Sequence, residues 1–328
     1  MFSSMDRVRL RVERAVGPPV VVEASDFEHF NFMDGDKLFI EPAAAESAMP
    51  NTWGDRHIEI APGHAIRVPT EMRYFDFKGF RIPVHLITLT GAGPETLDWI
   101  GSAHIRNFER TIGLHDDMCF VDLGCGIGRD AFQLMDRLSP AGRYIGIDVT
   151  RDSIVWCQRN ITPRHANFSF HHVDAYNELY NPFGRHKTTD FRLPLSDGTV
   201  DRIGLASVFT HLLRDEVVHY MKEFARVLKP DGLVHASFFL YSPEALKAAE
   251  SLGTTAWKAS FAHAQGQGVY TNDPSYPRGA VAYTDSAMQQ MMQEAGLVTD
   301  RPYIKGGWSG LWGDQAEEGQ DAVVLRRA

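Results

Sequence analysis

The segment that decides the fold is Val121-Asp122-Leu123-Gly124-Cys125-Gly126-Ile127-Gly128-Arg129-Asp130. Its apolar start predicts a buried strand, and its three glycines predict a tight loop that leads into a helix. Glycines let the backbone approach a ligand closely, and the start of a helix offers free N–H groups to it. The segment therefore predicts a ligand site at the end of a strand.

The sequence on both sides of this loop alternates predicted strands with predicted helices. We expect strands at 118–123, 143–147, 168–173, 202–208 and 233–240. We expect helices at 97–112, 130–138, 152–159, 215–228, from 243 and around 288–295, with Asp152, Asp215 and Ser242 as caps. This alternation predicts a doubly wound α/β fold, whose ligands bind at the carboxyl ends of the parallel strands.

Residues 1–90 follow another pattern, with short strand-like stretches and turns. The candidates are 7–14, 20–22, 37–40, 57–60 and 80–89, with a segment rich in Ala and Pro from 41 to 55. We therefore predict two units: a small β-rich or irregular N-terminal module, residues 1–90, and a cofactor-binding domain, residues 91–328. The aromatic and glycine-rich stretch 253–283 is predicted to be irregular.

The composition of the chain limits the classes of partner that we expect. The 328 residues include 42 acidic and 33 basic side chains, a net charge of −9, which disfavours a broad electrostatic contact with nucleic acid or a membrane surface. No window approaches the roughly 20 apolar residues of a membrane span, and charges stand where a signal peptide needs its apolar stretch. Three cysteines suit neither a disulfide framework nor a four-ligand zinc site. We expect a cytoplasmic protein without a metal.

The type of cofactor follows from the residues around the loop. Asp148 ends the next predicted strand, where a carboxylate can accept hydrogen bonds from ribose hydroxyls. No Gly-Lys-Ser/Thr ending follows Gly128, which disfavours a nucleoside triphosphate. The pattern Gly126-x-Gly128-x-x-Ala131 leaves NAD open. The carboxylate of Asp122 would repel a pyrophosphate but suits an ammonium group, which favours S-adenosylmethionine.

Five motifs, in the right order, resemble those of class I S-adenosylmethionine-dependent methyltransferases. They are Asp122-x-Gly124-x-Gly126-x-Gly128, Gly146-Ile147-Asp148, Phe170-His171-His172-Val173-Asp174-Ala175, the segment 193–201 and the segment 227–232. The resemblance covers roughly residues 95–328. It implies a mostly parallel, Rossmann-like sheet of seven strands with an antiparallel last strand, for which Ala322–Arg326 is the candidate.

The resemblance also implies the cofactor site. Asp122 and the glycines would surround the methionine part, Asp148 would bind the ribose, and Asp174 would accept from the adenine amino group. Ser207 would lie under the cofactor, and the thiol of Cys125 is expected to pack. The full set of predicted cofactor-binding residues is Asp122, Gly124, Cys125, Gly126, Gly128, Asp148, Val149, Asp174, Ala175 and Ser207.

The candidate catalytic residue is His211, just past the fourth strand of the domain. It could take the proton from a hydroxyl acceptor, and a structural role in the next helix stays open as the alternative. The segments 176–192 and 303–312 are expected to shape the acceptor pocket. Their character is similar to that of bacterial enzymes that methylate sugars, polysaccharide ends or natural products.

Several functions remain open at this point. The favoured one is methyl transfer to a hydroxyl of a small molecule. The alternatives are N-methylation of a small amine, an NAD-dependent oxidoreductase, and a binding or scaffold protein that has kept the fold. Residues 1–90 could form a homodimer, cover the acceptor or do neither.

Overall fold

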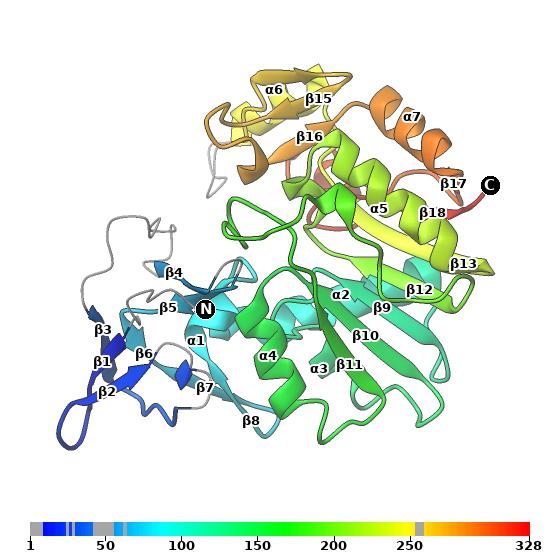
Figure 1. The fold of residues 1–328 in the computed structure, drawn as a ribbon. Coiled ribbons are helices and arrows are strands. Elements are labelled where there is room, and N and C mark those ends of the chain that lie inside the picture. Colours follow the sequence, from blue (N-terminus) through cyan, green and yellow to red (C-terminus); the bar gives the residue numbers. More distant parts are fainter. Residues whose placement is uncertain (1–8, 24–25, 28–29, 42–55, 62–63, 253–258) are drawn as a thin grey trace.

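A seven-stranded sheet forms the centre of the chain in the computed structural model, which describes residues 9–23, 26–27, 30–41, 56–61, 64–252 and 259–328 (Figure 1). Its strands are β9 (Cys119–Leu123), β10 (Arg143–Asp148), β11 (Phe168–His172), β12 (Val200–Leu205), β13 (Leu228–Phe238), β17 (Leu297–Thr299) and β18 (Asp321–Arg327). The order is β11-β10-β9-β12-β13-β18-β17. Neighbours from β11 to β13 are parallel, and β18 is antiparallel to both β13 and β17. The predicted fold class is confirmed.

Helices cover both faces of this sheet. They are α2 (Leu97–Ile112), α3 (Ala131–Leu134), α4 (Arg151–Asn160), α5 (Arg214–Val227) and α7 (Asp285–Ala295). The helix α6 (Pro243–Leu252) instead packs its Leu246 against a separate cluster that includes Phe239 and Phe261. Successive side chains of a strand point to opposite faces. Phe120 accordingly packs in one buried cluster with α2, α3 and α4, and Val121 packs in another with α5 and α7. Met288 and Met291 of α7 are fully buried in the second cluster, as the helical spacing of the apolar residues predicts.

Several helix starts differ from the predicted ones. Ser242 caps α6 as expected, since its Oγ accepts from the Ala245 N–H at 3.0 Å. Asp152 does not cap α4; its Oδ2 accepts from the Arg67 N–H at 2.6 Å instead, a long-range contact that no local pattern reveals. The residue before α5 is Leu213, whose N–H donates to Glu216 Oε2 at 2.7 Å, so Asp215 is not the cap.

The N-terminal region contains small antiparallel sheets, drawn in blue in Figure 1. The first consists of β1 (Arg9–Glu13), β2 (Val20–Glu23), β3 (Asp36–Glu41) and β6 (Glu71–Met72). The hairpins β4 (Arg56–Ala61) with β5 (His64–Val68), and β7 (Tyr74–Phe77) with β8 (Phe80–Pro83), follow the same antiparallel pattern. Leu10, Val12 and Ile66 are among the buried residues of a separate cluster in this region.

The predicted strand at 80–89 is wrong in its second half. It ends at Pro83, and residues Val84–Thr88 form a short helix, α1. Short apolar runs are compatible with either state, and the tertiary packing decides here. Phe80, Leu86 and Ile87 join the buried cluster of α2 and α3. The division at residue 90 stays a prediction, and the packing places 80–89 with the second unit.

The stretch predicted to be irregular holds a small sheet. Its strands are β14 (His263–Gly266), β15 (Val269–Thr271) and β16 (Val281–Tyr283), all antiparallel; residues 253–258 lie outside the described ones. The Tyr283 hydroxyl donates to the backbone oxygens of Phe209 at 2.7 Å and Leu212 at 2.5 Å. The small sheet thereby fixes the loop that follows β12.

Candidate active site

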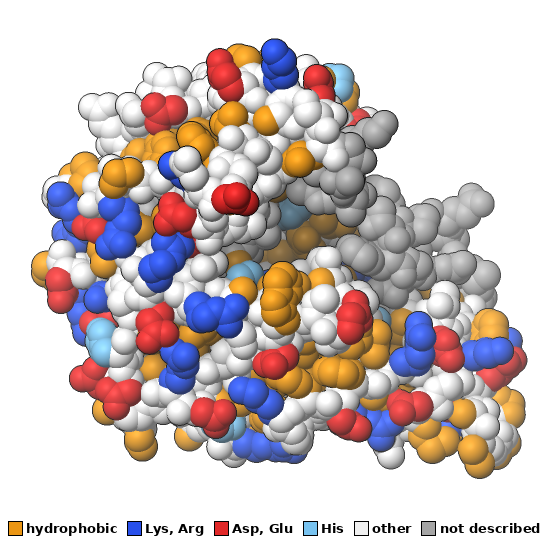
Figure 2. Space-filling model, turned by 180° about the vertical axis from the view of Figure 1, so that it is seen from behind, with side chains coloured by type: hydrophobic (Ala, Val, Ile, Leu, Met, Phe, Trp, Pro, Cys, Tyr) orange, Lys and Arg blue, Asp and Glu red, His pale blue; other side chains and the backbone are white. Residues whose placement is uncertain are grey.

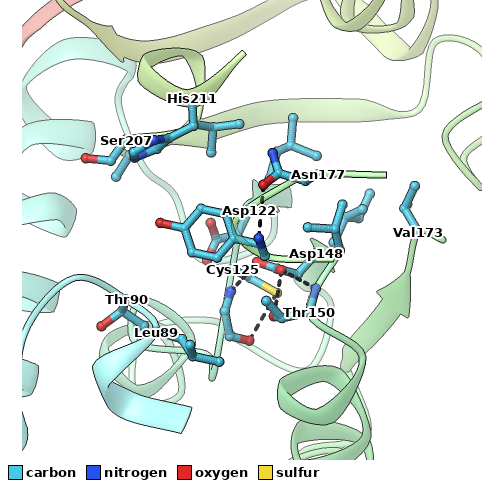
Figure 3. A pocket seen from close by; sticks show the side chains of 18 of the residues that line it. Leu89, Thr90, Asp122, Cys125, Asp148, Thr150, Val173, Asn177, Ser207 and His211 are labelled. Carbon is cyan, nitrogen blue, oxygen red and sulfur yellow. Dashed lines mark hydrogen bonds between the residues drawn. The ribbon is translucent and has the colours of Figure 1, made fainter. Parts of the chain in front are cut away.

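A large pocket lies at the carboxyl ends of β9, β10 and β12, with about 1050 Å³ of space between its walls and the solvent (Figure 3). Open α/β sheets bind ligands at this edge. Of the predicted site residues, the pocket brings together Asp122, Gly124, Cys125, Gly126, Asp148, Val149, Ser207 and His211. Gly128, Asp174 and Ala175 are not among its walls.

The glycine loop makes the floor of the pocket. Gly124 and Gly126 have φ angles of 81° and 50°, which glycine adopts without strain. A Cβ atom at Gly124 would lie 2.4 Å from the Val208 side chain, which lines the same pocket. At Gly128 a Cβ would instead meet Ile161 and Cys157, so this glycine serves the packing of the loop on α4.

Two buried acids lie at the glycine-loop end. The Tyr144 hydroxyl donates to Asp122, and both carboxylate oxygens of Asp130 lie 3.0 Å from His104 Nδ1. Burial first, and the neighbouring Asp130 second, raise the pKa of Asp122 well above its usual value. A cation bound here would stabilise the charged carboxylates. Asp130 was not predicted as a pocket residue, although it ends the quoted loop.

Asp148 holds the loop against β10. Its Oδ2 accepts from the Gly126 N–H at 2.7 Å, and its Oδ1 accepts from both the N–H and the hydroxyl of Thr150 at 2.7 Å. A carboxylate has about four acceptor positions. One position therefore remains available to a ligand in the pocket.

Ser207 follows β12 in a strained conformation. Its φ of 59° is uncommon for a residue with a side chain. Its N–H donates to Ser237 Oγ at 2.8 Å, and its own Oγ accepts from Gln320 Nε2 at 2.8 Å. Strain of this kind persists where surrounding bonds impose it, and it clusters at functional sites.

His211 lies four residues further along the same loop. Its Nδ1 is 2.9 Å from the backbone oxygen of Arg278. A carbonyl only accepts, so in the neutral ring Nδ1 carries the hydrogen and Nε2 carries the lone pair. Burial lowers the pKa of His211 and outweighs the hydrogen bonds to the backbone of Arg278 and Gly279, which raise it. The ring is therefore neutral at pH 7.

Arg278 is itself held from two sides. Its N–H donates to Glu178 Oε1 at 2.7 Å, and its Nε lies 3.1 Å from Glu216 Oε2 of α5. The side chains of Arg278 and Glu216 are only 19% and 10% exposed. The segment after β11 and helix α5 thus fix the carbonyl that orients His211.

The segment 176–192 forms another wall, contributing Asn177, Tyr180 and Thr188. The Tyr180 ring meets the His211 ring edge-on at a centroid distance of 5.7 Å. The prediction that this segment shapes the pocket therefore agrees with the geometry, but the individual residues could not be read from a stretch without a recognisable motif. The segment 303–312 is not part of this pocket; Trp308 and Trp312 line a separate cavity with α6.

The described residues contain no group of three or more His, Cys, Asp or Glu side chains placed to hold a metal ion. Within the same ranges, none of the helices combines the length and the apolar character that crossing a membrane requires.

The pocket fits a nucleoside cofactor with a cationic amino-acid part. The acids at the glycine-loop end suit an ammonium group, Asp148 suits a ribose, and a side chain at Gly124 would fill the floor.

Comparison with known proteins agrees with this geometry. The profile of the family described as "Methyltransferase domain" matches residues 120–232. An uncharacterized 37.1 kDa protein in a transposon of Streptomyces fradiae is 30% identical over 112 residues. That match covers 34% of this chain and only 27% of the relative's length.

Two solved structures are similar in fold. One is a SAM-dependent methyltransferase from Aquifex aeolicus, with 15% identity, a TM-score of 0.44, and coverage of 74% of this chain and 97% of that one. The other is geranyl diphosphate C-methyltransferase from Streptomyces coelicolor, with 13% identity, a TM-score of 0.44, and coverage of 69% and 79%.

Residues 120–232, which hold the glycine loop and run from β9 into β13, thus match a methyltransferase domain, and the pocket lies at the carboxyl ends of strands in this part of the chain.

Proposed function

We propose that the enzyme transfers a methyl group to a hydroxyl of a small molecule, with His211 as the general base. The observation that carries this proposal is the hydrogen bond from His211 Nδ1 to the Arg278 carbonyl, which leaves the lone pair on Nε2. His211 lines the pocket together with Ser207 and the glycine loop. A buried, neutral histidine is suited to accept a hydroxyl proton.

The floor of the pocket would hold the cofactor. Asp122 and Asp130 would bind the ammonium of the methionine part, and the remaining acceptor position of Asp148 would bind the ribose. When bound, S-adenosylmethionine supplies the methyl group from its sulfonium centre. The acids complement the positive charge of this cofactor, which supports the assignment.

The chain's own residues would perform the rest of the reaction. The walls would hold the acceptor oxygen in line with the methyl group that the cofactor would supply, whose carbon–sulfur bond would leave its electron pair on sulfur. His211 Nε2 takes the hydroxyl proton and later releases it to water. Because the transfer is an in-line displacement, alignment of the acceptor by the walls contributes much of the rate.

The walls favour an uncharged acceptor with polar and apolar parts. Tyr180, Tyr220 and Leu212 offer aromatic and aliphatic surface, with the polar groups of Ser207 and His211 beside them. Three carboxylates in the same pocket disfavour an anionic acceptor. A polyhydroxylated sugar or natural product fits this character. An amine acceptor needs less help from a base than a hydroxyl does, so the arrangement of His211 favours the hydroxyl acceptor.

Partners and compartment are part of the proposal. On the face in Figure 2, basic and acidic side chains alternate rather than gather, which supports a small molecule over a nucleic acid or a membrane. The same face is hollowed, with hydrophobic side chains inside the hollow. Cys119, Cys125 and Cys157 are free and buried, which supports a reducing cytoplasm.

The N-terminal region could also provide a homodimer contact. Phe39 and Val21 lie opposite Arg11 in neighbouring strands, and their side chains are 39% and 53% exposed. A second copy could cover this small apolar row. The molecular mass in solution of the wild type and of the variant Phe39→Glu tests this homodimer contact.

Two measurements test the proposed function. Calorimetry should show that S-adenosylhomocysteine binds and that NAD does not; binding of NAD alone would reject the methyltransferase assignment. A metabolite panel with labelled S-adenosylmethionine should give label in hydroxyl compounds. Label found only in amines would reject the hydroxyl acceptor and His211 as base.

A further inference from the structure

Asp174, the acid that the sequence assigns to adenine, forms an ion pair with Arg185. Its Oδ2 accepts from Arg185 Nε at 2.6 Å, and its side chain is 14% exposed. Burial raises the pKa of Asp174, but the hydrogen bonds from Arg185 outweigh it, and the net pKa is below its ordinary value. The carboxylate therefore fastens the segment 176–192 and is not a wall of the pocket.

Asn177 stands in the pocket wall instead. Its Oδ1 accepts from the Leu179 and Tyr180 N–H groups, both at 3.0 Å, which fixes which end of the amide is oxygen. Its Nδ2 makes no hydrogen bond to any described residue, and the residue is only 6% exposed. Figure 3 shows Asn177 beside the pocket, on the side of Val173 and Asp148. The amide thus offers a fixed donor to a ligand.

Thr188 provides the complementary group. It lines the same pocket and is 5% exposed, and its hydroxyl makes no hydrogen bond within the described part of the chain. A ligand that covers this hydroxyl without bonding to it would leave a polar group unpaired, which costs free energy, and a ligand that bonds to it avoids that cost. Asn177 and Thr188 come from the same segment, and both lie past the end of β11.

We infer that Asn177 and Thr188 read the adenine edge of the cofactor in this chain, and that Asp174 only holds their segment in place. The Watson–Crick edge of adenine presents one acceptor, the ring N1, and one donor, the amino group. Asn177 Nδ2 donates to the ring nitrogen, and Thr188 Oγ1 accepts from the amino group. The inference rests on the assignment of S-adenosylmethionine as cofactor.

The first test is Asn177→Asp, which keeps the oxygen that holds the turn and replaces only the donor. Affinity for S-adenosylhomocysteine, measured by calorimetry, should fall roughly tenfold or more. S-inosylhomocysteine, whose ring N1 carries a hydrogen, should bind the variant better than it binds the wild type. Equal losses for both ligands would overturn the inference.

The second test is Thr188→Val, a change of nearly equal shape. It should lower the affinity for S-adenosylhomocysteine about three- to tenfold. The affinity for the purine riboside form, the analogue that lacks the amino group, should change by less than about twofold. Equal weakening of both ligands would assign Thr188 to packing and contradict the inference.

A matched pair tests the role of Asp174. Asp174→Asn and Arg185→Gln break the same ion pair, so both should change the affinity for S-adenosylhomocysteine by the same factor. A tenfold loss in Asp174→Asn with no loss in Arg185→Gln would show that Asp174 binds adenine and would overturn the inference. If the wild type does not bind S-adenosylhomocysteine at all, the cofactor assignment fails instead.

Discussion

The floor and the roof of the pocket are built in different ways. The floor consists of the glycine loop and the strand ends, with Asp122, Gly124 and Asp148, and it comes from consecutive elements of the sheet. The roof consists of His211, Arg278 and the two acids that hold Arg278, Glu178 and Glu216, joined by contacts between residues 62 to 100 positions apart. Backbone geometry therefore determines the floor, and a few buried ionic contacts determine the roof.

Because the two parts are built differently, changes in them should affect cofactor binding and turnover separately. A change in the floor should weaken cofactor binding, because we propose that the cofactor lies against the backbone of the glycine loop. A change in the roof should leave the cofactor bound and disturb the acceptor and the base.

Among changes that leave His211 itself in place, the largest effect is expected for Arg278→Met in the roof. Removal of one partner from a buried ion pair leaves Glu216 uncompensated, which costs about 3 kcal/mol of unfolding free energy. Urea denaturation measures this cost. Turnover should fall at least roughly tenfold, because the segment that carries the carbonyl bound to His211 loses its anchor.

The double variant Arg278→Met with Glu216→Gln is the control for that prediction. It removes the uncompensated charge and should recover at least half of the lost stability. The affinity for S-adenosylhomocysteine should stay within about threefold of the wild type in both variants. A large loss of cofactor affinity would mean that floor and roof are not separable.

A smaller effect is expected for Gly124→Ala in the floor. The new Cβ would meet Val208, and the left-handed backbone adds about 1–2 kcal/mol of strain. Cofactor affinity should fall at least roughly tenfold by calorimetry. Gly198→Ala is the matched control, since Gly198 also has a positive φ, 64°, but open space around it. Equal losses of affinity in both variants would contradict a specific role for Gly124.

The smallest effect concerns pH. In the proposed mechanism the neutral form of His211 is the active one, and burial lowers its pKa below the ordinary 6.5. Turnover at saturating substrate should therefore be constant from about pH 7 upward and fall only as the pH drops below that value. A rise in turnover between pH 7 and 8 would contradict this assignment.

The same comparison explains what the sequence predicted. The floor lies in one segment with local signals: glycines need positive φ, and strands end in acids, so Asp122, Gly126 and Asp148 were placed in the pocket correctly. Asp174 also ends a strand, but its partner Arg185 lies in a segment without a motif, and the local signal could not reveal that ion pair.

The roof depends on contacts that are distant in sequence. The small sheet β14-β15-β16 and the backbone oxygen of Arg278 reach His211 from residues predicted to be irregular. The helix α1 depends in the same way on packing against α2, which a short apolar run does not encode. The sequence located His211 but not the groups that orient it.

The variant His211→Asn tests the central claim most directly, because its amide can keep the hydrogen bond to the Arg278 carbonyl while it removes the base. Turnover and the dissociation constant of S-adenosylhomocysteine should be measured on the same preparation. We predict a loss of turnover of about 10²–10⁴-fold with the dissociation constant changed by less than about twofold. Unchanged turnover, or an equal loss of cofactor affinity, would contradict the account.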